Sequence, residues 1–352
     1  MLVISKGDLH MKTSVSLVVG LGLLFVTQGS VLVLNNDFSD DAKEVSVFIR
    51  IADDLPAGQS RPGLREKARR LLDRISRMSQ LKRVSIRCNV DNDADMHLPM
   101  EIFAGLTNLS ELALCGTAER PILISSFSSM KSVPVEELKL RHVRIKEVES
   151  LSSMKHLRRL TTDAPWVLDK VPVDLEELSI KSVAIESFVD LSRFTKLRTL
   201  ELHDFSCVSV LGIEKMTNLQ SLWLCGSFDL DFGELKSCRK LSSLSLLGGY
   251  NWKGLLDTWA LSELPLERLY IDSVPIRELR GLEKCPLKDV EISNCPVRDL
   301  ESICDLPCLE RLDVRGTCID TIDKNTIKMR FPKLKVYEGM ANGDMNAITY
   351  YW

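Results

Sequence analysis

The sequence has little net charge, few histidines and none of the short strings that mark common catalytic sites. Its formal net charge is −3, so it lacks the strongly basic balance typical of nucleic-acid-binding proteins. The strings GxxxxGKS/T, GxSxG, HExxH and GxGxxG are absent. The histidines are scattered and form no recognisable pair: His10, His97, His142, His156 and His203. Because catalysis needs several groups or a metal brought together, we expect no enzyme activity, no cofactor, no metal and no nucleic-acid partner.

The ten cysteines do not have the spacing of a small disulfide framework or of a zinc site. Several recur at equivalent places relative to the repeated pattern described below, as Cys115 and Cys225 do. A free cysteine behaves as a small buried hydrophobic residue, so the recurrence predicts buried thiols. One or two disulfides are the alternative, with Cys304 and Cys308 as the first pair to consider.

The first thirty residues have the pattern of a targeting segment. Lys6 and Lys12 precede an apolar run, Val15–Val26, and small or polar residues follow up to Gly29. This arrangement is typical of a secretory signal peptide and predicts one at residues 1–29. An uncleaved membrane anchor and a buried strand of the folded protein are the alternatives. Asn108, in the tripeptide Asn-Leu-Ser, is a candidate glycosylation site.

Residues 30–80 contain no repeat and are expected to form an N-terminal cap. Alternating apolar and polar residues predict a strand at Glu44–Ile51. Pro62 then opens an amphipathic helix whose apolar face extends to Met78. A strand and a helix of this kind would cover the core that a solenoid exposes at its end. The helix is rich in arginine, which indicates either its solvated face or a site for an anionic partner.

From Leu81 onward one short pattern, LxxLxL, recurs at intervals of mostly 22 residues. Its starts are Leu81, Leu109, Val135, Leu157, Leu175, Leu197, Leu219, Leu241, Leu266, Leu287 and Leu309, with a degenerate start at Leu334. We therefore expect a repeat region at 81–333 and a C-terminal cap at 334–352. The tail of that cap either folds back over the last repeat or forms an exposed recognition peptide.

The period of two within each predicted strand decides which side chains face the core. The apolar fourth and sixth positions of a repeat point inward, and the third, fifth and seventh point outward. Behind the strands, apolar residues at a spacing of three predict short 3₁₀ or extended segments, as in Val143, Ile145, Val148 and Leu151. Such narrow backs predict a gently curved, all-parallel stack.

The LxxLxL strand followed by an IxxLxxL run, as in LERLYIDSVPIRELRGL from Leu266 to Leu282, resembles the 22-residue class of leucine-rich-repeat proteins. Bacterial internalins and the leucine-rich regulatory subunit of protein phosphatase 1 are of this type. The resemblance extends from Leu81 to the end of the chain. It implies an α/β solenoid, an arc with a parallel concave sheet and short convex segments, which binds another protein on its concave face. The family often places Asn at the ninth position, but that ladder is missing here.

Aromatic and apolar residues gather at outward positions in the middle of the repeats. Trp223, Leu247 and Tyr270 occupy consecutive rows, which at about 4.8 Å per strand lie within roughly 10 to 15 Å. Trp, Tyr and Arg are enriched at the energetic centres of interfaces. The predicted partner-binding residues are His203, Trp223, Leu247, Tyr250, Trp252, Arg268, Tyr270 and Asp272. The alternative for Trp252, and the expectation for Trp259, is a place in the convex core.

Taken together, the sequence predicts a non-catalytic recognition scaffold that binds a protein, secreted or exposed at the cell surface. The alternative is an intracellular adaptor or regulatory subunit of an enzyme in the cytoplasm, which the many cysteines and single sequon would also suit. Membrane insertion is expected only if residues 1–29 form an uncleaved anchor.

Overall fold

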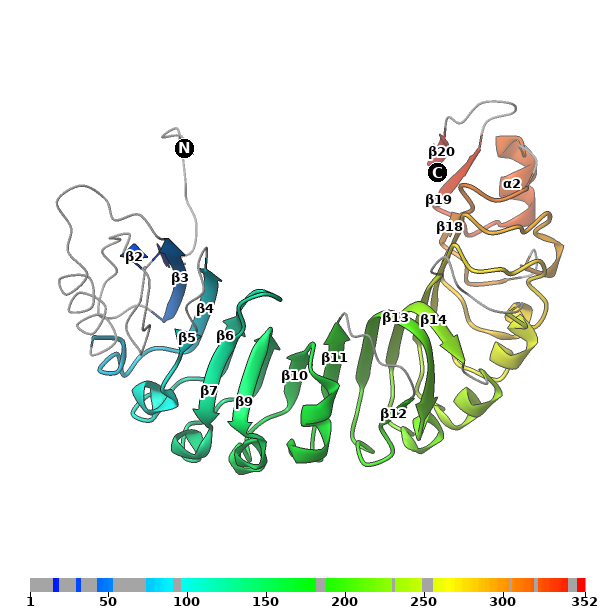
Figure 1. The fold of residues 1–352 in the computed structure, drawn as a ribbon. Coiled ribbons are helices and arrows are strands. Elements are labelled where there is room, and N and C mark those ends of the chain that lie inside the picture. Colours follow the sequence, from blue (N-terminus) through cyan, green and yellow to red (C-terminus); the bar gives the residue numbers. More distant parts are fainter. Residues whose placement is uncertain are drawn as a thin grey trace, which may run out of the picture. The chain divides into compact units, whose positions relative to one another are not determined.

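The computed structural model describes residues 15–18, 30–32, 43–52, 74–90, 96–181, 188–229, 232–248, 256–303, 306–319, 322–340 and 347–351. By its internal contacts the chain divides into two compact units. The first contains residues 1–157 together with 166–172, and the second contains residues 158–165 together with 173–352. Each unit is a stack of short strands backed by short helices (Figure 1).

The main sheet of the first unit is built around β3 (Glu44–Ala52). This strand pairs in parallel with β1 (Val15–Val18) and β4 (Arg83–Val90), and antiparallel with β2 (Ser30–Leu32). The sheet continues in parallel from β4 to β6 (Glu111–Cys115) and then to β8 (Glu137–Arg141). A second parallel sheet lies behind it, with strands β5 (Met96–His97), β7 (Ile122–Ser126) and β9 (Val143–Glu147). The short helices are η1 (Met100–Phe103), η2 (Ser128–Met130) and η3 (Val148–Ser153), and η4 (Pro165–Lys170) follows.

The second unit carries a long parallel sheet. Its strands follow in spatial order as β10 (Arg159–Thr162), β11 (Glu177–Lys181), β13 (Thr199–Leu211), β14 (Ser221–Asp229), β15 (Ser243–Gly248), β16 (Arg268–Asp272), β17 (Asp289–Ser293), β18 (Arg311–Asp313) and β19 (Val336–Met340). Beside the far end of β13 lies β12 (Phe188–Asp190). The backing helices are η5 (Ile213–Lys215), η6 (Phe232–Ser237), η7 (Thr258–Leu261), η8 (Leu282–Lys284), η9 (Glu301–Ile303) and α2 (Lys324–Arg330).

The core of the second unit lies between the strands and these short helices. In β14, Leu222 and Leu224 at the fourth and sixth positions are buried, as the period of two predicts. From the opposite wall, each 3₁₀ helix contributes one fully buried aliphatic residue, for example Ile213, Leu235 and Leu261. Burying one such side chain stabilises the fold by roughly 1.5 to 3 kcal/mol. The spacing of three behind the strands therefore marks one inward side chain per turn.

In several repeats the chain turns after the strand at the eighth residue of the repeat. At this position His142, Ser273 and Asn294 have φ values of 49°, 55° and 52°, in the left-handed region that residues other than glycine rarely occupy. The amide of Ser273 donates to the carbonyl of Ser293, and that of Asn294 to the carbonyl of Arg315. Backbone groups of adjacent repeats thus satisfy each other where the family uses an asparagine ladder.

The tail folds back on the last repeat, which confirms one of its two interpretations. Strand β20 (Ala347–Tyr351) pairs antiparallel with β19. The rings of Tyr337 and Tyr350 stack across this pair with centroids 5.8 Å apart. Burial raises the pKa of Tyr337 to about 12. This hydrophobic contact fixes the reversed strand in place.

The structure describes only part of the N-terminal segment for which predictions were made. The strand expected at Glu44–Ile51 is confirmed as β3. The expected helix from Pro62 falls mostly outside the described residues, although Ile75 and Met78 near its end are buried. Most of residues 1–29 also lie outside them, apart from β1. The domain boundaries and the three interpretations of this segment stay predictions. Within the described part of the chain, no helix has the length and apolar character needed to cross a membrane.

The expectation of buried thiols holds for part of the cysteines. Cys238, Cys285 and Cys295 are buried. Their sulfur atoms donate to carbonyls of the preceding repeat, as Cys238 does to Ile213 at 3.5 Å and Cys285 to Leu261 at 3.4 Å. The expectation is wrong for Cys318, which is exposed because it lies in the turn after β18. Cys304 lies outside the described residues.

Candidate functional site

Five outward side chains lie next to one another on the second unit, and we call them the central row. All occupy the fifth position of their repeats, and the strand register pairs each with the next. In order they are Glu201, Trp223, Ser245, Tyr270 and Glu291. We call the side of the sheet that carries the third, fifth and seventh positions of these strands the open face. An aromatic pair flanked by two carboxylates therefore lies across its middle.

Trp223 and Tyr270 contact each other across the strand that separates them. Their ring centroids are 6.3 Å apart and the rings are inclined by 24°, although two strand spacings amount to about 9.6 Å. The residue between them is Ser245, whose short side chain leaves the space above β15 open. Both rings lean into this space and stack. Stacking of this kind contributes about 0.5 to 1.5 kcal/mol beyond area burial.

His203 extends the aromatic group on the other side of Trp223. Its ring centroid lies 5.9 Å from that of Trp223, and its Nε2 lies 3.3 Å from a carboxylate oxygen of Glu201. The register between β13 and β14 shifts just after Leu202. Such irregularities re-aim side chains, which explains why a seventh-position residue of β13 reaches the ring of Trp223. Three of the predicted residues, His203, Trp223 and Tyr270, are thus brought into one cluster.

Burial affects the polar groups in and around this cluster. The Trp223 indole nitrogen is buried and has no hydrogen-bond partner, which is uncommon for a buried donor. Burial, together with the nearby carboxylates of Asp272 and Glu291, raises the pKa of Tyr270. Its hydroxyl therefore remains protonated at neutral pH. Burial also raises the pKa of Glu291, with Asp313 adding to the effect and Arg311 opposing it.

The remaining predicted residues surround the cluster with different roles. Leu247 is half-buried and lies between Cys225 and Asp272 in the register. Arg268 is exposed at the third position beside Ser243 and Asp289. Asp272 is committed to the turn, since its Oδ1 accepts hydrogen bonds from Asn294 at 2.7 Å and from Ser273 and Ser293 at 3.2 Å. Tyr250 and Trp252 lie outside the described residues.

The predicted glycosylation site has a structural role in the first unit. Asn108 is exposed, and its side-chain amide donates to the carbonyl of Ser79 at 2.5 Å. Asn218 stands at the same place in its repeat and donates to the carbonyl of Thr195 at 3.2 Å. The asparagine before the repeat start therefore bonds to the segment that precedes its own repeat in both places. Modification of Asn108 stays a prediction.

An ion network that the sequence did not reveal surrounds the buried carboxylate of Asp313 on the open face near the last repeats. Asp313 lies at an outward position, yet its side chain has no exposed surface. Arg315 donates to it through Nη2 at 2.6 Å and Nε at 3.0 Å. Arg311 donates to Glu291 at 3.3 Å and to Glu338 at 3.2 Å. Hydrogen bonding to Asp313 raises the pKa of Arg315, which favours the charged form of its guanidinium.

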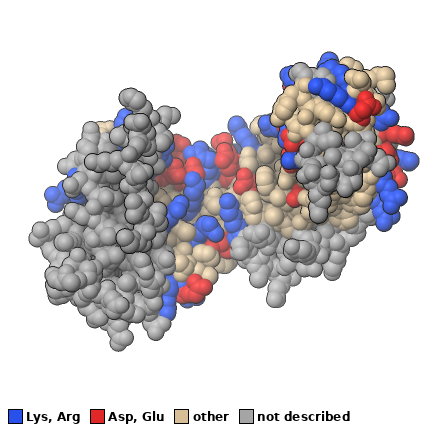
Figure 2. All heavy atoms as spheres, turned by 90° about the horizontal axis from the view of Figure 1, so that it is seen from above, with Lys and Arg blue, Asp and Glu red and all other residues tan. Residues whose placement is uncertain are grey.

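The charges on this surface do not favour one sign. In the space-filling view, Lys and Arg are interspersed with Asp and Glu over the visible described residues (Figure 2). Arg311 of the second unit, for example, lies 3.5 Å from Asp289 and 3.3 Å from Glu291. Steering by a large single-sign field is therefore not the means by which this surface would select a partner.

Comparisons with known proteins return distant structural neighbours. No protein-family model matches the sequence, and no curated protein matches it. An internalin from Listeria monocytogenes is 17% identical over 82% of this chain and 72% of its own, with a TM-score of 0.44. The ectodomain of the Arabidopsis thaliana receptor kinase GASSHO1/SCHENGEN3, solved in complex with CASPARIAN STRIP INTEGRITY FACTOR 2, is 16% identical over 84% of this chain and 35% of its own, with a TM-score of 0.48. A Leptospira interrogans leucine-rich-repeat protein is 14% identical over 82% and 88%, with a TM-score of 0.37.

These identities and TM-scores are too low to transfer a function from those proteins to this chain. The fold is evident from the chain's own repeats. Each predicted start is followed two residues later by a strand of the main sheet, from Leu81 and β4 to Leu334 and β19. Within each unit, each of these strands is parallel to the next and is followed by a short return segment. The repeating segments of the chain are leucine-rich repeats. The leucine-rich-repeat solenoid presents its open face as one continuous sheet surface within the second unit.

One core prediction is wrong. Trp259 was expected in the convex core of the leucine-rich-repeat solenoid, but its side chain is 52% exposed. The 3₁₀ helix η7 turns Thr258 and Leu261 inward instead, and Trp259 lies on its outer side. A helix of one turn has few inward positions, so the larger indole is left outside. The only sequence signal for this arrangement was Asp257, whose carboxylate caps η7.

Proposed function

We propose that this leucine-rich-repeat solenoid is a non-catalytic scaffold that binds a protein partner on the open face of its second unit, the concave face of the sequence prediction. The cluster of His203, Trp223 and Tyr270 forms the centre of the proposed site. The observation that carries the proposal is the stacked Trp223–Tyr270 pair at 6.3 Å, a large aromatic surface held in place on the solvent side of a rigid sheet.

Three features of the cluster support this assignment. First, both rings are half-buried and stacked, so little side-chain entropy is lost when a partner covers them. Second, Glu201 and Glu291 at the ends of the central row supply a polar rim around an aromatic centre, which is the usual anatomy of an interface. Third, aromatic anchors on rigid elements account for most of the energy in many interfaces. The site therefore has anchor, rim and support in one surface.

The partner can be identified by photo-crosslinking. A photoreactive amino acid at Ser243, an outward position next to the central row, would capture a protein that covers the open face, and mass spectrometry would identify it. The affinity of that protein is then measured for the wild type and for the double variant Trp223→Ala/Tyr270→Ala. We expect binding at least about 30-fold weaker, as for two interface hot-spot residues.

A matched control is available in the first unit. Trp166 is 50% exposed on η4, so Trp166→Ala removes an exposed indole from another place. Full affinity in this control, with loss in the double variant, supports the proposed site. Equal affinity of the double variant and the wild type would refute it, provided that circular dichroism shows both proteins folded.

We propose secretion or surface exposure on the basis of the apolar run Val15–Val26 that follows two lysines. One observation favours the intracellular alternative, an adaptor or regulatory subunit. Cys238, Cys285 and Cys295 are free thiols, and secreted proteins usually pair their cysteines. N-terminal sequencing of the mature protein separates the two, because only the secretory route removes residues up to about Gly29.

A further inference from the structure

A second surface lies on the helical side of the second unit, opposite the open face. Two pockets meet there at the exposed indole of Trp259. One, of about 630 Å³, is lined by Leu256, Asp257, Thr258, Trp259, Arg277, Glu278 and Arg280. The other, of about 490 Å³, is lined by Glu214, Gly233, Glu234, Lys236, Ser237, Trp259, Ala260, Ser262 and Glu263. We call the two together the Trp259 groove.

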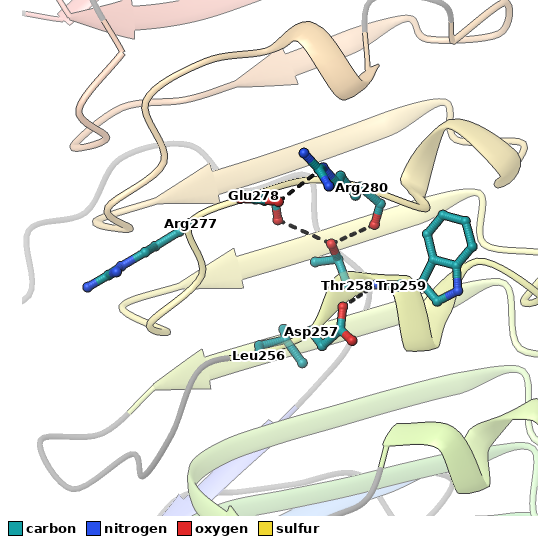
Figure 3. A pocket seen from close by; sticks show the side chains of 7 residues that line it. All are labelled: Leu256, Asp257, Thr258, Trp259, Arg277, Glu278 and Arg280. Atoms are coloured by element: carbon teal, nitrogen blue, oxygen red, sulfur yellow. Dashed lines mark hydrogen bonds and ion pairs between the residues drawn. The ribbon is translucent and has the colours of Figure 1, made fainter.

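The backbone beneath Trp259 is fixed from three directions (Figure 3). Asp257 accepts a hydrogen bond from the Trp259 amide at 2.9 Å. The buried hydroxyl of Thr258 lies 2.8 Å from the carbonyl of Arg280 and 3.1 Å from that of Glu278, both in the next repeat. Gly281 packs so closely that a Cβ there would lie 2.9 Å from the Trp259 Cα. The exposed indole is therefore held on a rigid base, the arrangement that binding sites require of an anchor residue.

The two pockets differ in charge. In the larger pocket Arg280 pairs with Glu278 at 3.1 Å and Asp257 caps the helix, so its charges are nearly balanced. The smaller pocket holds three carboxylates, Glu214, Glu234 and Glu263, against the single ammonium of Lys236. Within the described residues no group of acidic, histidine or cysteine side chains is close enough to hold a metal ion. The excess negative charge therefore suits an extended cationic side chain better than a bound metal.

The indole itself already engages a cation of this kind. The ammonium of Lys284 lies 4.0 Å from the centroid of the Trp259 ring, within the range of a cation–π contact. Long basic side chains combine an apolar stem with a charged end. Such a side chain can lay its stem along the indole while its charge reaches the carboxylates of the smaller pocket.

We propose that the Trp259 groove binds a basic segment of a partner protein, with a Lys or Arg in the smaller pocket against Trp259. The argument rests on charge complementarity and on the rigid, exposed indole that both pockets share. This site lies on the side of the sheet away from the central row, so it is independent of the proposed open-face site. A scaffold with both surfaces holds two proteins at once.

The probe for this proposal is acetylated, amidated hexa-arginine, titrated into the full chain labelled with 5-fluorotryptophan. The chain has five tryptophans, and Trp259→Phe assigns the ¹⁹F resonance of Trp259. We expect this resonance to move on titration while that of Trp223 stays in place. In the double variant Glu234→Gln/Glu263→Gln the affinity should fall about fivefold, as two exposed charge contacts are lost. Both substitutions change exposed residues, so folding is preserved.

The matched control is Glu301→Gln, which removes an exposed carboxylate from η9 on the same side of the unit. An unchanged affinity in this control, together with the loss in the double variant, supports the groove. Three results would overturn the proposal: no shift of the Trp259 resonance, comparable shifts of all tryptophan resonances, or the same affinity in the double variant and the wild type. Hexaglutamate in place of hexa-arginine should leave the resonance unmoved.

Discussion

Arg315 forms a two-pronged ion pair with Asp313, and the carboxylate that it holds is completely shielded from solvent. The other described outward side chains of β18 and its neighbouring strands are partly exposed to solvent. The ion pair therefore buries the charge of Asp313 at an outward position of the sheet. The desolvation of this carboxylate is compensated only while all its hydrogen-bond donors are in place. A buried charge whose partner is removed is strongly destabilising.

Removing Arg315 should accordingly weaken the last repeats. The variant Arg315→Met keeps the aliphatic stem and leaves Asp313 with Arg311, whose Nη2 lies 3.6 Å away. We expect a loss of about 2 kcal/mol, below the usual 3 to 5 for a buried pair because Arg315 is partly exposed. Urea unfolding measures it. The control is Arg277→Met, an exposed arginine, which should change the unfolding free energy by less than about 0.5 kcal/mol; equal effects would contradict the role of the pair.

The buried thiols predict a loss of stability at alkaline pH. Burial raises the pKa values of Cys238, Cys285 and Cys295 from 9.0 to about 11. In this range the unfolded chain releases protons that the folded chain retains, so stability is full below pH 9 and falls as pH rises from about 9 to 11. Urea midpoints measured between pH 8 and 11 follow this change. In Cys285→Ala the decline should be shallower, and an identical slope would exclude the thiol as its source.

The turn at the eighth position predicts an order of stability between two variants of Asn294. Both Asn294→Gly and Asn294→Ala lose the hydrogen bond to Asp272, so that loss cancels in the comparison. At a φ of 52° an alanine is strained and a glycine is not, so the glycine variant should be more stable by about 1 kcal/mol. At the strand position Ser221 the order should reverse. Chemical unfolding of the four proteins checks both comparisons.

The stack of Trp223 and Tyr270 depends on the small residue between them. In Ser245→Leu the branched side chain fills the space above β15 and separates the two rings. The position is outward and half-buried, so we expect the melting temperature to change little. The near-ultraviolet circular dichroism of the ring pair should diminish, and partner binding should weaken. An unchanged near-ultraviolet spectrum would show that Ser245 does not control the stack.

The sequence predicted the strands of the repeat region because most are marked three times, by apolar residues at the first, fourth and sixth positions. The outward positions followed from alternation, and Trp223 and Tyr270 do lie two strands apart on the same face, as predicted; the contact of His203 with Trp223 was not predicted. The stacking itself could not be predicted, since it depends on the size of Ser245 in an adjacent strand. The left-handed backbone conformation at the eighth position could not be predicted either, because His, Ser, Asn and Gly all adopt it there and no single residue type marks it.

The errors have a common physical origin. The burial of Trp259 and Cys318 was predicted from residue type, which favours burial for both. Both side chains are exposed because the tight turns around them leave few inward positions. Asp313 was judged by alternation, which favours exposure, whereas two arginines and Glu338 close over it. In each case the surroundings of the side chain, a tight turn or a set of charged partners, decide its exposure.

The turn amides of Ser273 and Asn294 and the thiols of Cys238 and Cys285 share one property, which is that each donates a hydrogen bond to an adjacent repeat. Such an array behaves as a chain of nearest neighbours. When a ligand restricts the motion of one repeat, the effect extends over one or two adjacent repeats and does not reach the whole protein. A ligand on Trp223 would slow amide exchange in β13 to β16 and leave distant strands as they were. The molecule is thereby suited to carry separate binding events that do not influence one another.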